Sequence, residues 1–357
     1  AGIGVVAALG LAADRAGDFE SNMADVAKVT SVDTARKLED DLMRLSERIP
    51  VSRSELTKLA EQAGKFGIEG EENIAQFVET AGKMSTAMDL PAGELGKRMA
   101  KISQATDTPI SQIDKLGNAT NALADSMKTD AGEITDTATR AGITLSNRLG
   151  MSADQVLSLS ASMNEVSPSS RRAAGALRKM TSALMDPSKT EDLAEALGMT
   201  PEKFKEMREQ EPQKLMERIA TGLDGNTEKS EALSEALGKR GVESFSRFGE
   251  AIDSTEKAQE TVNEQFENGT SLQQEMELRT NTLHGQLQLL SDKLNNVATV
   301  IGQEVLPYVK DFVSRVSDSI DIVSDWLSSA GDAEGVFEDL GVVVDDVVTG
   351  VGDVVDV

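Results

Sequence analysis

Residues 48–56 read Arg-Ile-Pro-Val-Ser-Arg-Ser-Glu-Leu, and this short stretch predicts a tight corner between two helices. The residue before a proline avoids helical backbone angles, so a helix arriving from upstream must end before Pro50. Ser52 is a favoured first cap for the next helix, and Glu55, three positions later, completes a capping box. Helices that meet at such a corner form a compact bundle and cannot extend as one rod.

Similar signals for the end of one helix and the start of the next recur further along the chain. Leu149-Gly150-Met151-Ser152 and Leu197-Gly198-Met199-Thr200-Pro201 each place a glycine where a left-handed residue closes a helix. A Ser or Thr then caps the helix that follows. Apolar residues between these corners recur at helical spacing, and long β-branched alternation is absent. We therefore predict an all-α fold, with a compact multi-helix bundle of short helices followed by a long heptad-bearing helix.

The pattern changes after Asn268-Gly269, where apolar residues begin to recur at alternating steps of four and three. This is the spacing of a coiled-coil heptad, and it predicts self-association. A phase shift beside Pro307 interrupts the repeat. The alternative is a long helix packed on its own bundle, and the spacing does not separate the two. We call these residues the heptad seam: Leu283, Leu287, Leu290, Leu294, Val297, Ile301, Val305, Val309, Phe312 and Val316.

These patterns divide the chain into five expected segments. They are an apolar helical lead-in (1–18), two helical subdomains (19–150 and 151–269), a long coiled-coil-like helix (270–330) and a Val/Asp-rich amphipathic tail (331–357). Residues 1–13 are apolar but too short to span a bilayer. No methionine opens the chain and no charged residue precedes this stretch, so we interpret the chain as a fragment of a longer protein in preference to reading the stretch as a signal peptide.

The composition of the chain excludes several kinds of chemical site. The chain has 357 residues, a net charge of −25, one histidine and no cysteine. Such an acidic surface repels phosphates, so we expect no direct nucleic-acid binding by this segment. Disulfides and thiolate chemistry are excluded, and a His-rich metal site is out of reach. We expect no cofactor.

Candidate catalytic motifs have simpler interpretations. Residues 2–7 match the dinucleotide fingerprint G-x-G-x-x-A, but no strand can precede them, so small-residue helix packing or chance is favoured. His284 has no second histidine to assist it and is interpreted as a helix-surface residue. Paired carboxylates such as Asp40-Asp41 point apart on a helix and are interpreted as solvated surface.

A basic cluster stands out in this acidic chain. It consists of Arg171, Arg172, Arg178 and Lys179, on a segment that also carries Ala173, Ala174, Ala176 and Leu177. On one helix, the four cations could bind an acidic partner or a neighbouring subunit. The alternative is ordinary charge balancing within the chain.

An ordered series of short motifs resembles the core region of tail tape measure proteins of tailed viruses. The resemblance covers roughly residues 19 to 310 and rests on Phe19-Glu20, Met23-Ala24, the corner at 48–56, Phe77, Leu149-Gly150-Met151-Ser152, Asn268-Gly269-Thr270-Ser271, Asn281-Thr282, Gln286-Leu287, Ile301-Gly302 and Leu306-Pro307. That family has no catalytic motif to transfer, so the resemblance implies that the chain is not an enzyme.

The resemblance implies a structural virion protein that sets tail tube length. It would be assembled in the host cytoplasm, lie inside the tail tube or at the tip near the baseplate hub, and take part in genome ejection. The implied partners are other copies of the chain, as a trimer, together with the tail tube protein, distal tail or hub proteins and tail assembly chaperones. Contact with a host membrane during ejection is a further implication.

Three alternatives remain open at this point. One is a helical signalling or membrane-remodelling module unrelated to viruses. Another is an enzyme whose catalytic domain lies outside this segment. The third concerns the host: the acidic excess suits high salt and favours a haloarchaeal virus, whereas an acidic protein at moderate salt fits the same composition.

Overall fold

The structure is a computed structural model, and it describes residues 2–224, 228–282, 284–303 and 307. Tertiary contacts divide the chain into two compact units. One comprises Val26–Leu289, and the other comprises Ala1–Asp25 with Leu290–Val357. The expected boundaries at 150/151 and 269/270 fall inside the first unit, because helices far apart in the sequence pack together there.

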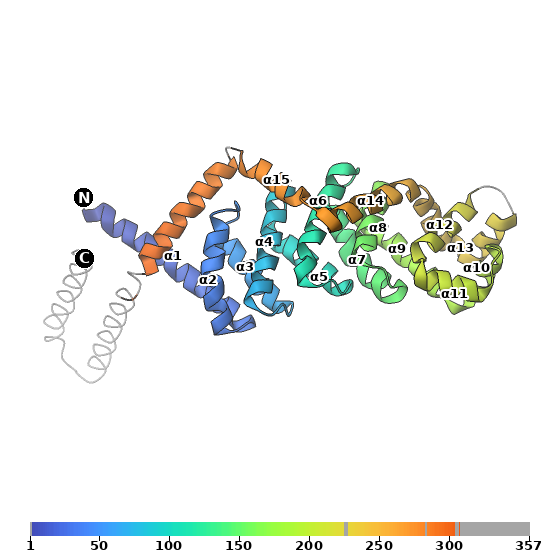
Figure 1. Ribbon diagram of the computed structural model, residues 1–357, viewed down its shortest axis with the longest axis horizontal. Coiled ribbons are helices and arrows are strands. Elements are labelled where there is room, and N and C mark those ends of the chain that lie inside the picture. Colours follow the sequence, from blue (N-terminus) through green and yellow to red (C-terminus); the bar gives the residue numbers. More distant parts are fainter. Residues whose placement is uncertain (1, 225–227, 283, 304–306, 308–357) are drawn as a thin grey trace, which may run out of the picture. The chain divides into compact units, whose positions relative to one another are not determined.

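The described residues confirm the all-α prediction, since every regular element among them is helical. Residues 284–303 form an unlabelled helix after the others (Figure 1). The labelled elements are α1 (Gly2–Val29), α2 (Val32–Ser46), α3 (Arg53–Lys65), α4 (Glu71–Met88), α5 (Ala92–Ala105), η1 (Ile110–Gln112), α6 (Ile113–Ser126), α7 (Ala131–Leu149), α8 (Ala153–Glu165), α9 (Ser170–Met185), η2 (Pro187–Lys189), α10 (Thr190–Ala196), α11 (Pro201–Gln210), α12 (Pro212–Leu223), α13 (Glu228–Gly249), α14 (Ile252–Asn268) and α15 (Ser271–Thr280).

The corner at residues 48–56 forms as its sequence predicts. Helix α2 ends at Ser46, ahead of Pro50, and the Ser52 hydroxyl accepts a hydrogen bond from the Glu55 N–H at 3.3 Å. In a full capping box the Glu55 carboxylate would accept a hydrogen bond from the Ser52 backbone N–H. In the structure it accepts one from the Ser52 hydroxyl, at 3.1 Å. Val51 and Leu56, on either side of the cap, are both buried.

The two glycine corners also form as predicted. Gly150 has a φ of 66° and Gly198 a φ of 68°. Both values lie in the left-handed region that often ends a helix, and glycine adopts it without steric strain because it has no Cβ. After Gly198, the Thr200 hydroxyl accepts from the Lys203 N–H at 3.3 Å, and Pro201 takes the first helical position. These corners explain why the helices are short.

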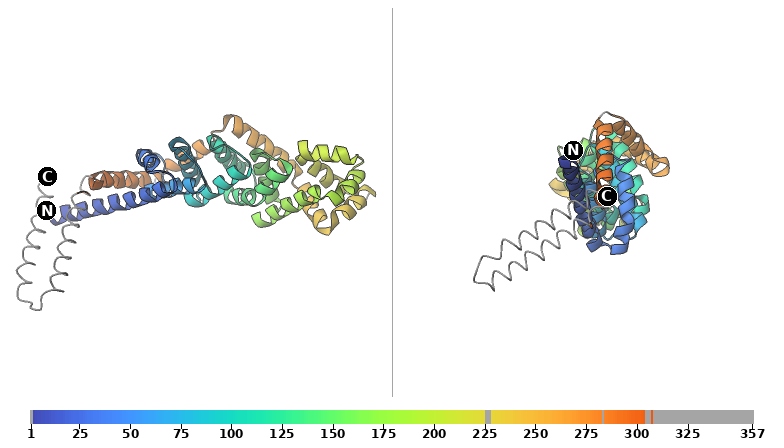
Figure 2. Two further views of the ribbon diagram at one scale, coloured as in Figure 1. Left: turned by 90° about the horizontal axis from the view of Figure 1, so that it is seen from below. Right: turned by 90° about the vertical axis from the view of Figure 1, so that its left-hand side faces the viewer.

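Within the unit Val26–Leu289, short helices pack in sequence order and the chain then turns back. Helix α3 packs on α4 and α5, α5 on α7, and α7 on α8 and α9, while α10–α13 gather at one end of the series. Helix α14 then lies on α8 and α6, and α15 lies on α6 and α4 (Figure 1 and Figure 2). We call α14 and α15 the return strap, because they cross the earlier helices in reverse order.

The junction between α14 and α15 is attached to α6 by two asparagines. The side-chain oxygen of Asn118 accepts from the Leu272 N–H at 3.0 Å, and the amide of Asn121 donates to the Ser271 hydroxyl at 2.8 Å. Leu272 is buried, and an added Cβ at Gly117 would stand only 3.0 Å from its Cδ2 atom. Glycine at 117 therefore lets the strap approach α6 closely.

Small and hydroxyl-bearing residues fill much of the core between the central helices. On α8, Ser158, Ser160 and Ser162 are all buried. The first two donate to carbonyls four residues earlier, and Thr255 of the strap donates to the Ser162 hydroxyl at 2.8 Å. These internal hydrogen bonds satisfy the hydroxyls, so burying them does not destabilise the fold.

Several Lys and Arg side chains bind the carbonyl ends of helices. Arg208 donates to the Leu184 carbonyl, Arg247 to the Val166 carbonyl and Lys189 to the Leu237 carbonyl. The carbonyl end of a helix carries partial negative charge and lacks internal donors, so a cation there is favourable. These three cations thus connect neighbouring helices by binding the carbonyl groups at helix ends.

The long helix expected over residues 270–330 is interrupted near its start. Helix α15 ends at Thr280, and the Thr282 hydroxyl accepts from the Gly285 N–H at 3.1 Å, which caps the helix of residues 284–303. Helix α1, by contrast, runs from Gly2 to Val29 across the expected boundary at 18/19. The tail at 331–357 lies outside the described residues.

Candidate interaction surfaces

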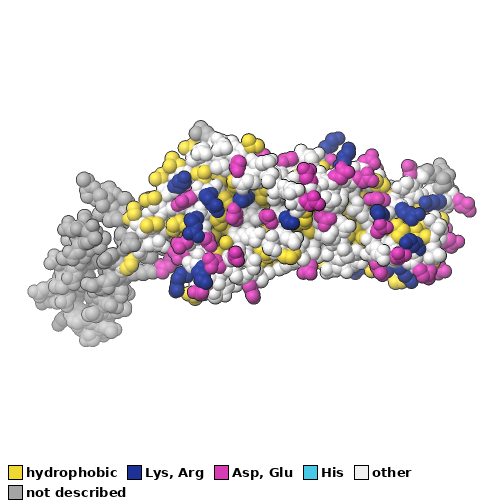
Figure 3. Space-filling view, in the orientation of Figure 1, with side chains coloured by type: hydrophobic (Ala, Val, Ile, Leu, Met, Phe, Trp, Pro, Cys, Tyr) yellow, Lys and Arg dark blue, Asp and Glu magenta, His cyan; other side chains and the backbone are white. Residues whose placement is uncertain are grey.

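The described part of the heptad seam is an exposed apolar surface. Figure 3 shows hydrophobic side chains along the helix of residues 284–303. The exposed fractions are 56% for Leu287, 54% for Leu290, 62% for Leu294, 57% for Val297 and 46% for Ile301. The other seam residues, Leu283, Val305, Val309, Phe312 and Val316, lie outside the described residues.

The other face of this helix is the buried one, and it is polar. Asp292, Asn296 and Thr299 are at most 3% exposed. A surface helix ordinarily turns its apolar face inward and its polar face to solvent. This helix does the reverse, and large exposed apolar patches mark interaction sites.

The basic cluster lies together on the solvent face of α9. Arg171, Arg172, Arg178 and Lys179 are all exposed, and none forms an ion pair with another described residue. The opposite face of α9, with Ala173, Ala174 and Leu177 among others, is buried. The cluster therefore forms no direct ion pairs within the described chain, although the Asp136 carboxylate lies nearby, where it accepts a hydrogen bond from Ser170.

An acidic stripe on α14 escaped the sequence analysis. It comprises Asp253, Glu256, Glu260, Glu264 and Glu267, which are exposed and form no ion pair with another described residue. Their steps of three and four residues place them on one face of the helix, where the exposed Lys257 is the one cation among them. That spacing was visible in the sequence, but a chain with 61 acidic residues hides one stripe among many.

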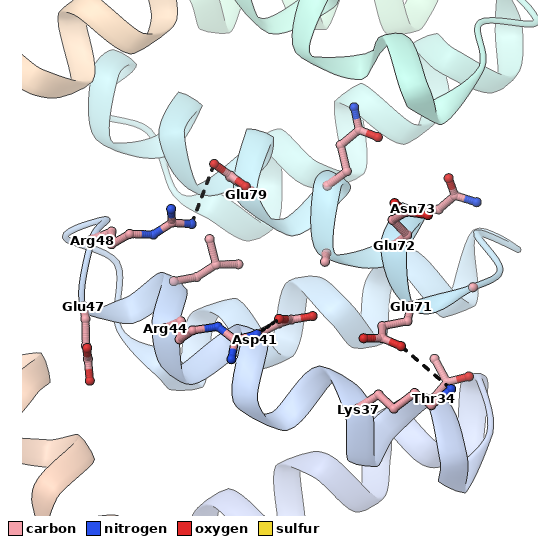
Figure 4. A pocket seen from close by; sticks show the side chains of 14 residues that line it. Thr34, Lys37, Asp41, Arg44, Glu47, Arg48, Glu71, Glu72, Asn73 and Glu79 are labelled. Carbon is pink, nitrogen blue, oxygen red and sulfur yellow. Dashed lines mark hydrogen bonds and ion pairs between the residues drawn. The ribbon is translucent and has the colours of Figure 1, made fainter.

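A polar groove of about 1240 Å³ lies between α2 and α4 (Figure 4). Two ion pairs cross it, Lys37 with Glu71 and Arg48 with Glu79, each at 4.0 Å. Its lining is mostly charged, with carboxylates in excess, whereas pockets for small organic ligands are mostly apolar. We therefore interpret this groove as a hydrated gap between two helices joined by weak ion pairs.

The candidate catalytic motifs lead to no active site in the described part of the chain. Residues 2–7 lie within helix α1, whereas the dinucleotide fingerprint requires a turn between a strand and a helix. His284 is exposed on the helix of residues 284–303. Among the described residues, no three His, Asp or Glu side chains are grouped so as to hold a metal ion. None of the described helices has both the length and the apolar character needed to cross a membrane.

The described helices thus present both charged and apolar faces to solvent. Comparison with known families identifies the class of protein. Residues 39–238, more than half of the chain, match the family of phage-related minor tail proteins, and the chain belongs to this family. It is thus a structural component of a phage tail, and hence of a virion.

One relative extends the similarity beyond the family match. The chain is 25% identical over 345 residues to a protein of Halomonas phage phiHAP-1 that is described as a probable tape measure protein. The alignment covers 89% of this chain but 40% of that relative, so the chain spans well under half of the relative's length. No solved structure matches the chain. The comparisons do not support a haloarchaeal origin.

Proposed function

We propose that this chain is part of a tail tape measure protein, which sets the length of the tail tube during assembly. The observation that carries the proposal is the similarity to the probable tape measure protein of the Halomonas phage, which runs through nearly the whole chain. A helix has a fixed rise of about 1.5 Å per residue, so the length of a helical protein can gauge the length of a tube. The short, back-folded helices of Val26–Leu289 cannot serve as that gauge. We place the measuring rod elsewhere in the protein.

Several copies of the chain associate through the heptad seam in this proposal, as a trimer. The exposed fractions of Leu287, Leu290 and Leu294 support it, because these side chains gain most from being covered. Charge supports it too. The helical positions that flank the described seam carry no carboxylate: they are His284, Gln286, Ser291, Lys293, Ala298 and Val300. Flanking charges set which helices can pair, so this strip, which has no carboxylate and one cation, lets two acidic copies approach.

The protein lies in the tail lumen or at the tip near the baseplate hub, and it leaves the tube during genome ejection. The seam bundles copies inside the tube, while the compact unit of short helices contacts tube, hub or chaperone proteins. Contact with the host membrane belongs to the ejection step. We propose no catalytic role for the described residues, in keeping with a structural tail family.

The length-setting role is tested in phage particles. In-frame deletions are made in the parent gene outside the codons for residues 26–289, and tails are measured by electron microscopy. We expect each deleted residue to shorten the tail by about 1.5 Å. Synonymous recoding of the same codons is the control and should leave the length unchanged. Tails of native, uniform length in the deletion phages, or in phages without the gene, would overturn the proposal.

A further inference from the structure

The basic cluster on α9 and the acidic stripe on α14 are complementary in spacing as well as in sign. Arg171 and Arg178 are seven residues apart, as are Arg172 and Lys179. On α14, Asp253, Glu260 and Glu267 repeat at the same interval. Seven residues are close to two helical turns, so both helices present charged groups about 10 Å apart along one face.

These two surfaces face different neighbours within one copy. Helix α14 packs on α8 and α6, whereas α9 packs chiefly on α7 and α13. No ion pair joins α9 to α14 among the described residues, although all nine side chains are exposed. Each charged face is therefore available to a separate molecule.

The middle of the basic face is also open to a close approach. Gly175 lies between the two pairs of cations, and apart from its chain neighbours and the backbone of its own helix no described atom stands within 4 Å of the position that its Cβ would occupy. A helix from another molecule can thus approach the backbone of α9 between the cations. A charged row with a small residue at its centre fits a helix that carries the opposite charges.

We propose that the basic face of α9 binds the acidic stripe of α14 on a second copy of the chain. The contact joins two different surfaces, so it is head-to-tail and can continue from copy to copy around a ring or along a filament. Exposed ion pairs are individually weak, so several pairs in register are needed. Such a contact concerns how copies assemble and does not require that the protein set tail length.

The test uses two charge reversals in the 357-residue chain. Variant P carries Arg171→Glu and Arg178→Glu, and variant Q carries Glu260→Lys and Glu267→Lys. Leu287→Ser and Leu294→Ser are present throughout, so that the heptad seam cannot contribute. Masses are measured by analytical ultracentrifugation in 0.15 M NaCl, where repulsion between distant charges is screened but close pairs persist.

We expect the unreversed chain to self-associate, and P or Q alone to raise the Kd by about tenfold or more. Mixing P with Q restores association, because each supplies the charge that the other lacks. The matched control, Lys97→Glu with Lys101→Glu, changes net charge as much as P does, on an exposed face of α5, and should associate normally. Unaltered circular dichroism shows that every variant is folded.

Three results would overturn the inference. The unreversed chain could remain monomeric, P could associate as well as the control, or the mixture of P and Q could stay dissociated. Cationic side chains also bind the phosphates of nucleic acids, so binding of the chain to duplex DNA is measured as well. If the chain bound DNA and P did not, the face would serve phosphates and the proposed protein contact would be wrong.

Discussion

Leucines at helical spacing are placed differently in two regions of this chain. In the helix array, Leu56 and Leu59 of α3 are fully buried. On the helix of residues 284–303, Leu287 and Leu294 are more than half exposed, while polar residues occupy the buried face. The spacing shows which residues share a face, and only the tertiary contacts show what covers that face. In the array the cover belongs to the same chain, and at the seam we infer that it belongs to other copies.

The largest expected effect separates these two regions directly. Leu59→Ala should lower the free energy of unfolding by about 2–5 kcal/mol, because it leaves a cavity among packed helices. Leu294→Ala should change the stability of the monomer by less than about 0.5 kcal/mol, because its side chain is already in solvent. Urea denaturation of dilute protein measures both. Equal losses for the two variants would contradict the structural difference between array and seam.

The second prediction concerns association at the seam. Leu287→Asp with Leu294→Asp should weaken self-association by about tenfold or more, because charges would enter an apolar contact. Light scattering over a range of concentrations measures the effect, and circular dichroism should show unchanged helix content. Leu278→Asp, on the exposed side of α15, is a matched control outside the seam. If the double variant kept the mass of the unmodified chain, the seam would have no role in association.

The return strap connects the two regions, and the third prediction tests its attachment. Asn118→Ala removes the acceptor for the Leu272 N–H, a buried group. A buried donor without a partner costs about 1–3 kcal/mol, which should appear in urea denaturation. Asn263→Ala loses only an exposed hydrogen bond and serves as the control. A loss at Asn118 no larger than at Asn263 would mean that the strap does not depend on this bond.

Local rules predicted the fold class and its corners well. The breaks near Pro50, Gly150 and Gly198 follow from backbone preferences that act within a few residues, so the sequence reveals them. Local rules could not predict where the return strap packs. Asn118 and Leu272 are 154 residues apart, and neither residue type by itself indicates a particular partner. The break after Thr280 was missed although Thr282, a favoured capping residue, stands there in the sequence, because the heptad spacing beyond it drew attention to one long helix.

The interaction surfaces were predictable in part. The seam and the basic cluster were recognised because each departs from its surroundings, the first in spacing and the second in sign. Their exposure could not be read from the sequence, because an amphipathic helix has the same spacing whether its apolar face is covered or free. The acidic stripe on α14 was missed because in this chain its composition is ordinary.

The smallest expected effect concerns charge inside the array and depends on pH. Burial raises the pKa of Glu217 on α12, and the nearby carboxylate of Glu256 adds to the rise, while a hydrogen bond from Gln213 opposes it. The folded chain therefore holds this proton at pH values where the unfolded chain has lost it, so stability falls as pH rises through that window. Glu217→Gln removes the charge and should raise the melting temperature slightly at pH 7, with the gain disappearing below about pH 4.

Asp136 on α7 is the matched control, with the opposite sign. Burial alone would raise its pKa, but hydrogen bonds from Arg140 at 2.7 Å and from Ser170 at 2.6 Å outweigh burial and lower it. Its stabilisation is present above the ordinary carboxyl pKa and is lost as pH falls through the lowered value, so Asp136→Asn should reduce the melting temperature at pH 7. Thermal denaturation between pH 3 and pH 8, about the accessible range for carboxyl titration, compares the two. Shifts of the same sign at pH 7 would show that net charge, and not the surroundings of each carboxylate, governs this acidic array.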